Sequence, residues 1–284
     1  MSNVTFNRVA QARSLLFVPG HRHERFEKAA RSGADAIVLD LEDSVPTASK
    51  AEARAAIQGE WTRLHTFDVP LLVRINAIET NLGKEDLAWL ERLAPPAAVM
   101  LPKAESPQTI ADVHRALSSV PVLPLIESAA GYAALPALAA APGVLRLAIG
   151  HLDFMADVGM QCDDDQSELA PLRFAVAVAT RLAGLPPAVD GVTEQMGDEK
   201  KLREDVKRAV RFGFRGKLCI HPSQVSVVHD AMAPTEQELE WARRVIAADA
   251  ASNGAAVQVD GCMVDLPVVL RARQILARAS GASQ

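Results

Sequence analysis

The feature that most constrains this chain is a recurring pattern of short apolar runs, each followed closely by a charged residue. The apolar run 36–39 is followed by Asp40, and the run 121–126 is followed by Glu127. Continuous apolar runs of this length are typical of strands that are buried on both faces of a parallel sheet. The charged residues at these positions are Asp40, Arg74, Lys103, Glu127 and Asp153. Because parallel barrels build their active sites from residues at the carboxyl ends of strands, the pattern favours an enzyme.

The order of the predicted elements indicates an α/β fold. Strands are expected at 14–18, 36–40, 70–74, 97–101, 121–126, 145–149, 187–190 and 216–220. Helices are expected between them, at 23–32, 47–58, 84–93, 107–118, 167–184 and 199–212. Eight strands that alternate with helices predict a closed (β/α)8 TIM barrel. The alternative is an open doubly wound sheet, which would need a G-x-G-x-x-G turn if it bound a dinucleotide, and the sequence has no such motif.

The chain continues beyond the eighth strand, and we expect two parts: a catalytic barrel at 1–234 and a C-terminal extension at 235–284. A helix is predicted from about residue 235, with Thr235 as its N-cap, and a last helix is predicted at 267–279. A barrel does not need this extension. The extension therefore packs either on its own barrel or on a neighbouring subunit.

Composition excludes several classes of protein. The net charge of −5 argues against a general nucleic-acid-binding surface, which needs clustered Lys and Arg. No apolar run approaches the roughly 20 residues of a membrane helix, and residues 1–13 lack the apolar core of a signal peptide. The three cysteines are widely spaced, which fits reduced thiols. We expect a cytoplasmic protein without nucleic-acid or membrane partners.

Glu127 and Asp153 form the clearest candidate metal site. Each follows a separate strand, and the two strands are neighbours in the predicted barrel, so the carboxylates should converge at its mouth. Two carboxylates with positions left for water and substrate suit Mg²⁺. A softer metal would need His or Cys beside them, and His151 is the one residue that could serve. The alternative is that both carboxylates form salt bridges at the starts of loops.

Two basic residues after predicted strands are candidates for contact with a substrate. Arg74 can bind a carboxylate or thioester oxygen, or it can be a structural partner of Asp40 or Asp43. Lys103 could form a Schiff base, but the nearby Glu105 predicts an ordinary ion pair instead.

Further polar residues are expected near the same end of the barrel. His221 follows the eighth strand and either lines the mouth or makes a hydrogen bond in the core. Arg22 belongs to a basic cluster at 21–25, directly after Pro19 and Gly20, and this cluster either holds phosphates or forms a solvated helix start.

Jointly, the motifs around these residues resemble the citrate lyase β-subunit family, part of the HpcH/HpaI aldolase and citrate lyase superfamily. The matching segments are Arg13–Gly20, Asp40–Val45, Arg74–Asn76, Pro102–Glu105, Leu125–Ala130, Gly150–Asp153 and Gly216–Pro222. Their order and spacing agree from about residue 13 to 279. The resemblance implies a TIM barrel, assembled as a homotrimer or homohexamer, that binds Mg²⁺ and makes or breaks C–C bonds in CoA thioesters of hydroxy acids.

The resemblance also assigns roles to residues. It implies that Glu127 and Asp153 bind the metal and that Arg74 contacts the substrate. The segment Met263–Pro267 resembles one that crosses to the adjacent subunit in relatives and places an Asp, here Asp265, over the neighbour's site. Several relatives carry an acidic residue directly before the metal-binding Asp, where this chain has Leu152, so the choice of substrate can differ.

These assignments predict Mg²⁺-dependent cleavage of a 3-hydroxyacyl-CoA into acetyl-CoA and a 2-oxoacid, with citramalyl-CoA favoured and citryl-CoA or malyl-CoA as other candidates. Asp265 is the candidate for proton transfer at the acetyl carbon, and Asp40 and Asp43 hold metal-bound waters or orient Arg74. Substrate and CoA contacts are assigned to Arg74, Pro19, Gly20, Arg22, Lys103 and His221. Two alternatives stay open: a malyl-CoA thioesterase, in which water attacks the thioester, and a non-catalytic CoA-binding homologue.

Overall fold

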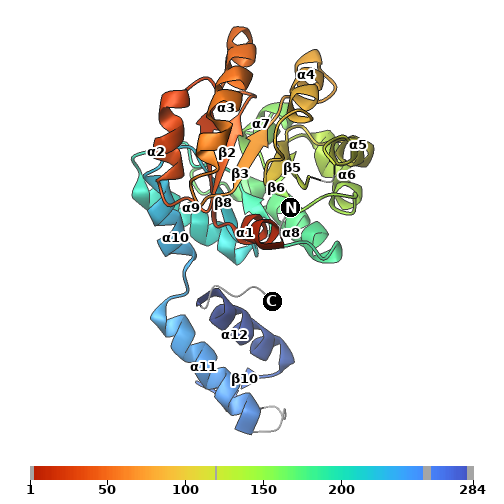
Figure 1. Ribbon diagram of the computed structural model, residues 1–284. Helices are drawn as coiled ribbons and strands as arrows, with labels where there is room; N and C mark the ends of the chain where they lie inside the picture. The colour runs from red at the N-terminus through yellow and green to blue at the C-terminus, as the bar shows by residue number, and fades with distance from the viewer. Residues whose placement is uncertain (1–2, 119, 252–256, 280–284) are drawn as a thin grey trace. The chain divides into compact units, whose positions relative to one another are not determined.

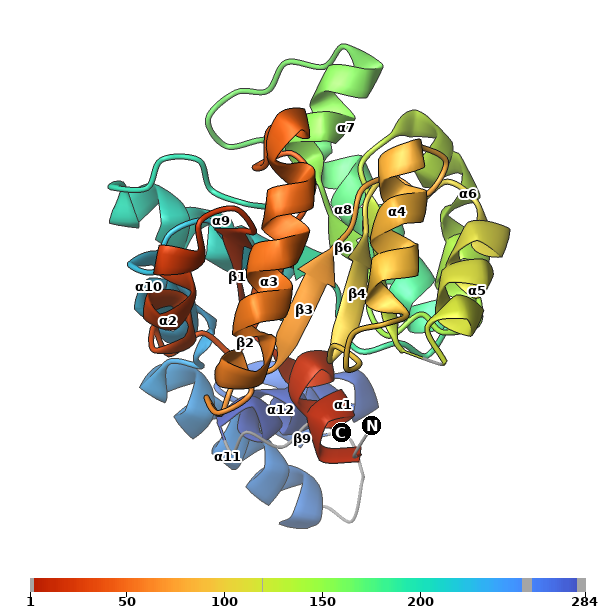
Figure 2. The ribbon, with the colours of Figure 1, turned by 45° about the horizontal axis from the view of Figure 1, so that its top comes forward.

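The computed structural model describes residues 3–118, 120–251 and 257–279. Its strands form a closed parallel barrel in which each strand pairs with the next along the chain and the last pairs with the first (Figures 1 and 2). The strands are β1 (Ser14–Pro19), β2 (Ala36–Asp40), β3 (Leu71–Arg74), β4 (Ala98–Leu101), β5 (Val122–Ile126), β6 (Ala148–Ile149), β7 (Val189–Asp190) and β8 (Gly216–Cys219). This topology confirms the predicted α/β class and the TIM barrel.

Helices surround the barrel, as Figure 2 shows. They are α1 (Asn3–Gln11), α2 (Phe26–Ala30), α3 (Lys50–Leu64), α4 (Asn81–Leu90), α5 (Pro107–Ala116), α6 (Ala129–Ala139), α7 (His151–Val158), α8 (Ala170–Leu182), α9 (Glu199–Arg211) and α10 (Gln224–Met232). Short 3₁₀ turns precede α2, α3 and α8 at His23–Arg25, Thr47–Ser49 and Ser167–Leu169. The helices α1, α6, α7 and α10 were not among the predicted segments.

Local sequence explains where several of these helices begin. The hydroxyls of Thr80 and Ser128 accept hydrogen bonds from the backbone N–H groups of Gly83 and Gly131, which caps α4 and α6. Asp198 caps α9 in the same way. Pro136 lies inside α6, and the helix nevertheless continues to Ala139. Side-chain caps therefore mark the first residues of α4, α6 and α9.

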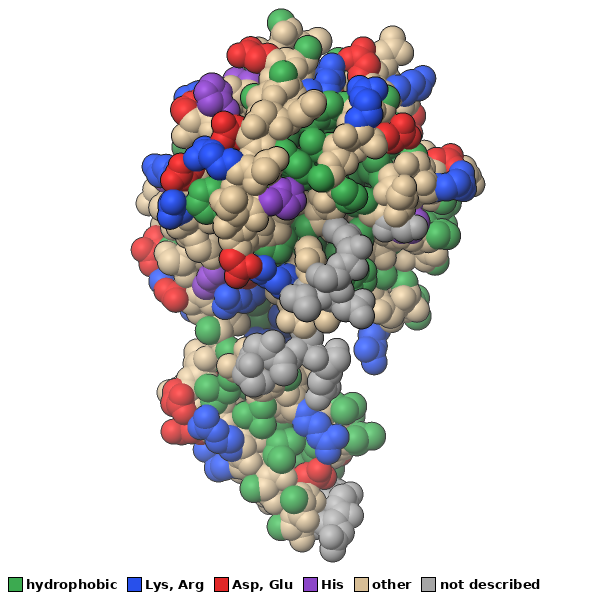
Figure 3. Space-filling model, in the orientation of Figure 1, with side chains coloured by type: hydrophobic (Ala, Val, Ile, Leu, Met, Phe, Trp, Pro, Cys, Tyr) green, Lys and Arg blue, Asp and Glu red, His purple; other side chains and the backbone are tan. Residues whose placement is uncertain are grey.

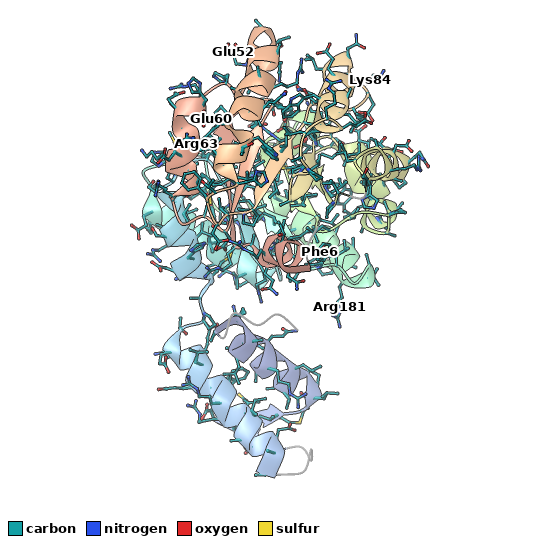
Figure 4. All side chains as sticks on the ribbon, in the orientation of Figure 1. Phe6, Glu52, Glu60, Arg63, Lys84 and Arg181 are labelled. Atoms are coloured by element: carbon teal, nitrogen blue, oxygen red, sulfur yellow. The ribbon has the colours of Figure 1, made fainter. Side chains whose placement is uncertain are left out.

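Helix α3 shows how a helix packs on the barrel, with buried apolar residues on one side and charged residues on the other. On α3 the buried residues include Ile57 and Trp61, whereas Glu60 and Arg63 form an exposed ion pair of 2.6 Å on its outer side (Figure 4). On the face seen in Figure 3, positive and negative side chains are interspersed. Within the described residues, no helix is long and apolar enough to cross a membrane.

The barrel interior is filled by apolar side chains from the strands, among them Leu15, Val38, Leu72, Met100 and Leu123. Arg146, completely buried, lies at the amino-terminal end of β6. It donates hydrogen bonds to the carbonyl oxygens of Ala12 (2.6 Å) and Val9 (3.3 Å), which ties the end of α1 to the barrel. Burial lowers the pKa of Arg146 to about 9, and the guanidinium is still protonated at neutral pH.

The chain forms two compact units, residues 1–229 and 230–284. The second unit contains α11 (Glu236–Ala251), the antiparallel pair β9 (Val257–Val259) and β10 (Cys262–Val264), and α12 (Leu266–Ala279). Thr235 and Glu238 form a capping box before α11, with hydrogen bonds of 2.8 and 3.2 Å, as the sequence predicted for Thr235. The predicted division at residue 234 stays a prediction.

Candidate active site

Most of the predicted site residues lie at the carboxyl ends of the barrel strands. Asp40 ends β2 and Arg74 ends β3, and the two residues face each other in the strand register. Glu127 follows β5 directly. Asp153 lies in the first turn of α7, which begins two residues after β6, the neighbour of β5. Consecutive strands β2 to β6 therefore bring these groups to one rim of the barrel.

Asp40 holds Arg74 in a fixed orientation. The Nε and Nη2 atoms of Arg74 lie 2.6 and 2.7 Å from the two oxygens of the Asp40 carboxylate. Asp40 is fully buried and also accepts hydrogen bonds from the backbone N–H groups of Glu42 and Ser44 and from the Ser44 hydroxyl. Burial alone raises the pKa of Asp40, but Arg74 and these donors hold it below its usual range. With its oxygens occupied in this way, Asp40 orients Arg74.

Glu42 is a member of this site to which sequence reasoning gave no role. Its carboxylate lies 2.8 Å from Nη1 of Arg74 and 3.6 Å from Nζ of Lys103, and the residue is buried. Burial raises the pKa of Glu42 to about 7, and the nearby Asp43 adds to this rise while Arg74 opposes it. Asp43 is more than half exposed and lies 3.8 Å from Arg74. Asp40 and Glu42, which are buried, therefore contact Arg74 more closely than Asp43 does.

Glu127 is a buried carboxylate with an unusually high pKa. One of its oxygens accepts a hydrogen bond from the backbone N–H of Lys103 at 2.7 Å. Burial raises the pKa of Glu127 to about 8, and the negative charges of Glu42 and Asp153 contribute to the rise. Gly150 makes room for this side chain, because a Cβ at Gly150 would lie 2.1 Å from Oε2 of Glu127. The space at the end of β6 is thus shaped around the Glu127 carboxylate.

The two carboxylates predicted as metal ligands fit a hard divalent cation. Burial and neighbouring negative charges destabilise the ionised form of Glu127. A cation bound beside the carboxylate would stabilise that form. Among the described residues, no group of three or more His, Cys, Asp or Glu side chains is placed to hold a metal unaided. Two carboxylates and a remainder of water and substrate oxygens match the needs of Mg²⁺ better than those of a softer metal.

His151 does not complete this donor set. Its ring is buried, and Nδ1 packs against Gly191, where a Cβ would lie 2.1 Å from that nitrogen. Burial, with the positive charge of Lys217, lowers the pKa of His151 to about 4, so the ring is neutral at physiological pH. The possibility that His151 recruits a softer metal has no support in this arrangement.

The predicted ion pair between Lys103 and Glu105 is wrong. The ammonium of Lys103 pairs with Glu42 at 3.6 Å, whereas Glu105 accepts a hydrogen bond from the hydroxyl of Ser128 at 2.6 Å. The backbone of Lys103 has a φ of 47°, a left-handed conformation that is uncommon for a residue with a side chain. Burial acts to lower the pKa of Lys103, but Glu42 and Asp43 outweigh it and raise the pKa. A protonated amine is an anion-binding group and not a Schiff-base nucleophile.

The other predicted contacts are less tightly organised. Gly20 follows Pro19 at the end of β1 and donates a 2.8 Å hydrogen bond to the Asp40 carbonyl, which a Cβ on Gly20 would approach to 2.7 Å. Arg22 is partly exposed and pairs with Glu24 at 2.5 Å. His221, partly exposed, lies beyond the end of β8, and its Nδ1 is 2.7 Å from the Ser223 hydroxyl. Gly20 therefore reaches the backbone of Asp40, whereas the contacts of Arg22 and His221 do not join these residues to the group around Arg74.

Asp265 belongs to the second unit, between β10 and α12. Its Oδ1 accepts a hydrogen bond of 3.3 Å from the backbone N–H of Val268, so the carboxylate caps α12. The structure therefore brings together Asp40, Asp43, Arg74, Lys103, Glu127 and Asp153, with Glu42 added. These residues all belong to the barrel unit, and Asp265 belongs to the second unit.

Comparison with known proteins gives consistent matches over most of the chain. The model of the family described as HpcH/HpaI aldolase/citrate lyase matches residues 13–222. A citrate lyase subunit beta-like protein of Deinococcus radiodurans is 34% identical, over 94% of this chain and 97% of the relative. A (3S)-malyl-CoA thioesterase of Cereibacter sphaeroides is 33% identical, over 94% of each chain.

Solved structures agree with these sequence matches. The structure of the protein CitE from Mycobacterium tuberculosis in complex with magnesium, acetoacetate and coenzyme A superimposes with a TM-score of 0.85. It is 35% identical in sequence, and the match covers 95% of this chain and 99% of that chain. The similarity therefore extends beyond the barrel into the C-terminal unit.

Proposed function

This chain belongs to the HpcH/HpaI aldolase/citrate lyase family, and on that premise we propose that it is a Mg²⁺-dependent lyase. Its substrate is a 3-hydroxyacyl-CoA, which it cleaves at a carbon–carbon bond to acetyl-CoA and a 2-oxoacid. Citramalyl-CoA, which gives acetyl-CoA and pyruvate, is the leading candidate, with malyl-CoA and citryl-CoA as the other two. The observation that carries this proposal is the pair Glu127 and Asp153 beside the fixed guanidinium of Arg74.

In this proposal Glu127 and Asp153 hold Mg²⁺. The bound metal would polarise the oxygen that becomes the oxo group of the product. Glu127 is fixed for this role by the N–H of Lys103 and by the space at Gly150. Because the pKa of Glu127 is raised to about 8, its carboxyl group would have to lose a proton to hold Mg²⁺ at neutral pH.

Arg74 and Lys103 supply positive charge to the substrate. Asp40 fixes the Arg74 guanidinium through two hydrogen bonds, so its position does not depend on the ligand. Charge develops on the thioester oxygen as the C–C bond breaks, and a preorganised cation stabilises it. Lys103 is about half exposed and protonated, which suits contact with a substrate carboxylate or a CoA phosphate. We assign the remaining CoA contacts to Pro19, Gly20, Arg22 and His221.

Cleavage moves a proton, which leaves the substrate's 3-hydroxyl group as the oxo group forms and is added at the acetyl carbon, and we assign the proton transfer at that carbon to Asp265 of an adjacent subunit. The proposed assembly is a homotrimer or homohexamer in which the extension at 235–284 covers the neighbour's barrel. The match to the CitE structure, which was solved with coenzyme A and covers this part of the chain, supports the assignment. We further propose a cytoplasmic location, which the free thiols of Cys162, Cys219 and Cys262 support.

A thioesterase is the second candidate, because one relative of similar identity is named a (3S)-malyl-CoA thioesterase. The same residues would hold the substrate, and water would attack the thioester carbon. The experiment is incubation of the protein and Mg²⁺ with citramalyl-, malyl- and citryl-CoA, followed by mass spectrometry. Acetyl-CoA and an oxoacid, both abolished by EDTA, establish the lyase. Free CoA with the intact hydroxy acid establishes the thioesterase, and no product from any of the three contradicts both assignments for these substrates.

A further inference from the structure

A buried charged cluster lies under the loop that follows β7 and has no part in the proposed chemistry. Asp190, the last residue of β7, is fully buried between Arg173 of α8, whose Nε donates at 3.0 Å, and Lys217 of β8, whose Nζ lies 3.7 Å away. These groups come from three separate elements of the last part of the barrel, α8, β7 and β8. Charges are expensive to bury unless they are paired and hydrogen-bonded, and here Arg173 and Lys217 pair with Asp190.

The held backbone is the short segment 191–193. The ammonium of Lys217 donates a hydrogen bond to the carbonyl of Gly191. At the other end of the segment, the hydroxyl of Thr193 donates to Asp205 at 2.7 Å, and the side chain of Gln224 donates to the Thr193 carbonyl at 2.9 Å. Lys217, Thr193, Asp205 and Gln224 are all buried, each with an exposure of 2% or less. The segment is therefore anchored at both ends by groups that have no access to water.

His151 packs against this anchored segment. The ring is 2% exposed, and its Nδ1 has no hydrogen-bond partner among the described residues. The contact with Gly191 is so close that a Cβ there would lie 2.1 Å from Nδ1 and 2.9 Å from Cε1. The ring therefore packs against the Gly191 backbone by van der Waals contact, and Nδ1 makes no hydrogen bond to the described residues.

His151 is also the first residue of α7, and Asp153 lies in the same first turn. We propose that His151 is a positioning residue for the metal site: the segment 191–193, clamped by Lys217 and Asp205, supports the His151 ring and so sets the start of α7 and the position of the Asp153 carboxylate. This inference rests on the proposed role of Asp153 as a Mg²⁺ ligand. It adds a specific requirement, that the residue at 191 has no side chain.

The test is Mg²⁺ binding to the full-length protein by titration calorimetry, with turnover as a second readout. Gly191→Ala should weaken Mg²⁺ binding at least tenfold, because the new methyl group displaces His151. Gly197→Ala is the matched control in the same loop, since a Cβ at Gly197 meets nothing within 4 Å, and it should bind Mg²⁺ like the wild type. At saturating Mg²⁺ the KM for the CoA thioester should be unchanged in Gly191→Ala.

A rescue distinguishes positioning from general damage to the fold. The double variant Gly191→Ala/His151→Ala removes the ring that the methyl group meets, so it should bind Mg²⁺ more tightly than Gly191→Ala alone. His151→Ala by itself should bind Mg²⁺ several-fold more weakly than the wild type, and this variant tests the inference if Gly191→Ala does not fold.

The inference is overturned if either single variant, folded by circular dichroism, binds Mg²⁺ within twofold of the wild type. It also falls if the double variant is no better than Gly191→Ala. Wild-type protein that binds no Mg²⁺ would overturn the proposed metal site as well, which separates the two failures.

Discussion

Replacement of Asp40 by Asn should destabilise the barrel strongly, because it breaks a buried ion pair from one side. Asn has nearly the shape of Asp, but it carries no charge and offers one oxygen where Arg74 now binds two. Arg74 has a side chain only 12% exposed, so its charge cannot be rehydrated in place. Removal of one partner of a buried pair costs about 3–5 kcal/mol, and the cost here should lie toward the lower end because Glu42 still contacts Arg74 at 2.8 Å. At roughly 2–4 °C per kcal/mol for a unit of this size, the melting temperature should fall by about 10 °C.

Asp43→Asn is the matched control for this prediction. It makes the same chemical change three residues away and faces the same guanidinium, but Asp43 is 55% exposed and lies 3.8 Å from Arg74. Exposed pairs contribute about 0–1 kcal/mol, so this variant should melt within about 3 °C of the wild type. The assay is thermal unfolding of both variants by circular dichroism at pH 7. An Asp40→Asn protein that melts with the wild type, or equal losses in the two variants, would refute the account of Asp40 as the buried anchor of Arg74.

Three other outcomes are expected. Gly150→Ala should lower the affinity for Mg²⁺ by at least tenfold, measured by calorimetry, because its Cβ would meet Oε2 of Glu127 at 2.1 Å; the control Gly59→Ala, which meets nothing within 4 Å, should have no effect. The affinity for Mg²⁺ should rise with pH up to about 8 and then level off, because the pKa of Glu127 is raised to about 8 and the metal competes with its proton below that pH; an affinity that is constant between pH 6.5 and 8.5 would contradict this. Asp265→Ala should keep Mg²⁺ binding and lose most turnover of the CoA thioester, and unchanged turnover would remove Asp265 from the mechanism.

The strands of the barrel could be predicted because most of them are short continuous apolar runs, which can be recognised from the local sequence alone. The predicted strand at 36–40 matches β2, and 216–220 differs from β8 by one residue. Helix α7 was missed because its eight residues are too few to show a clear apolar period. Helix α6 was missed because Gly131 and Pro136 are read as helix breakers, although Ser128 caps its start.

The site was predicted where the chemistry follows from strand ends, and it was missed where burial decides the pairing. Lys103 was paired with Glu105 because the two are close in sequence. The left-handed backbone at Lys103 and the burial of Glu42 produce a different pair, and neither can be read from a local pattern. Glu42 was given no role because three acidic residues stand together at 40–43. What separates Glu42 from Asp43 is its burial beside Arg74, a contact between β3 and the loop after β2.

Buried cations hold carbonyl groups in the loops of this barrel. Beyond the last paired residue of a strand, carbonyl groups lose their partners in the sheet and must be satisfied in another way if they are buried. Lys50, 5% exposed, donates to the carbonyls of Leu41 and Glu42 at 2.7 and 2.8 Å, in the loop after β2. Lys217 does the same for Gly191 after β7.

Arg146 serves the opposite end of the barrel, where it binds the carbonyls of Val9, Ala12 and Pro187. In each case a long flexible side chain brings several donors to carbonyls that no strand can reach. A sequence pattern assigns Lys and Arg to the surface, because there they are usually found. Lys50 and Lys217 therefore hold the loop that carries Glu42 and the loop that supports His151. Because a sequence pattern places both lysines on the surface, it does not predict this role.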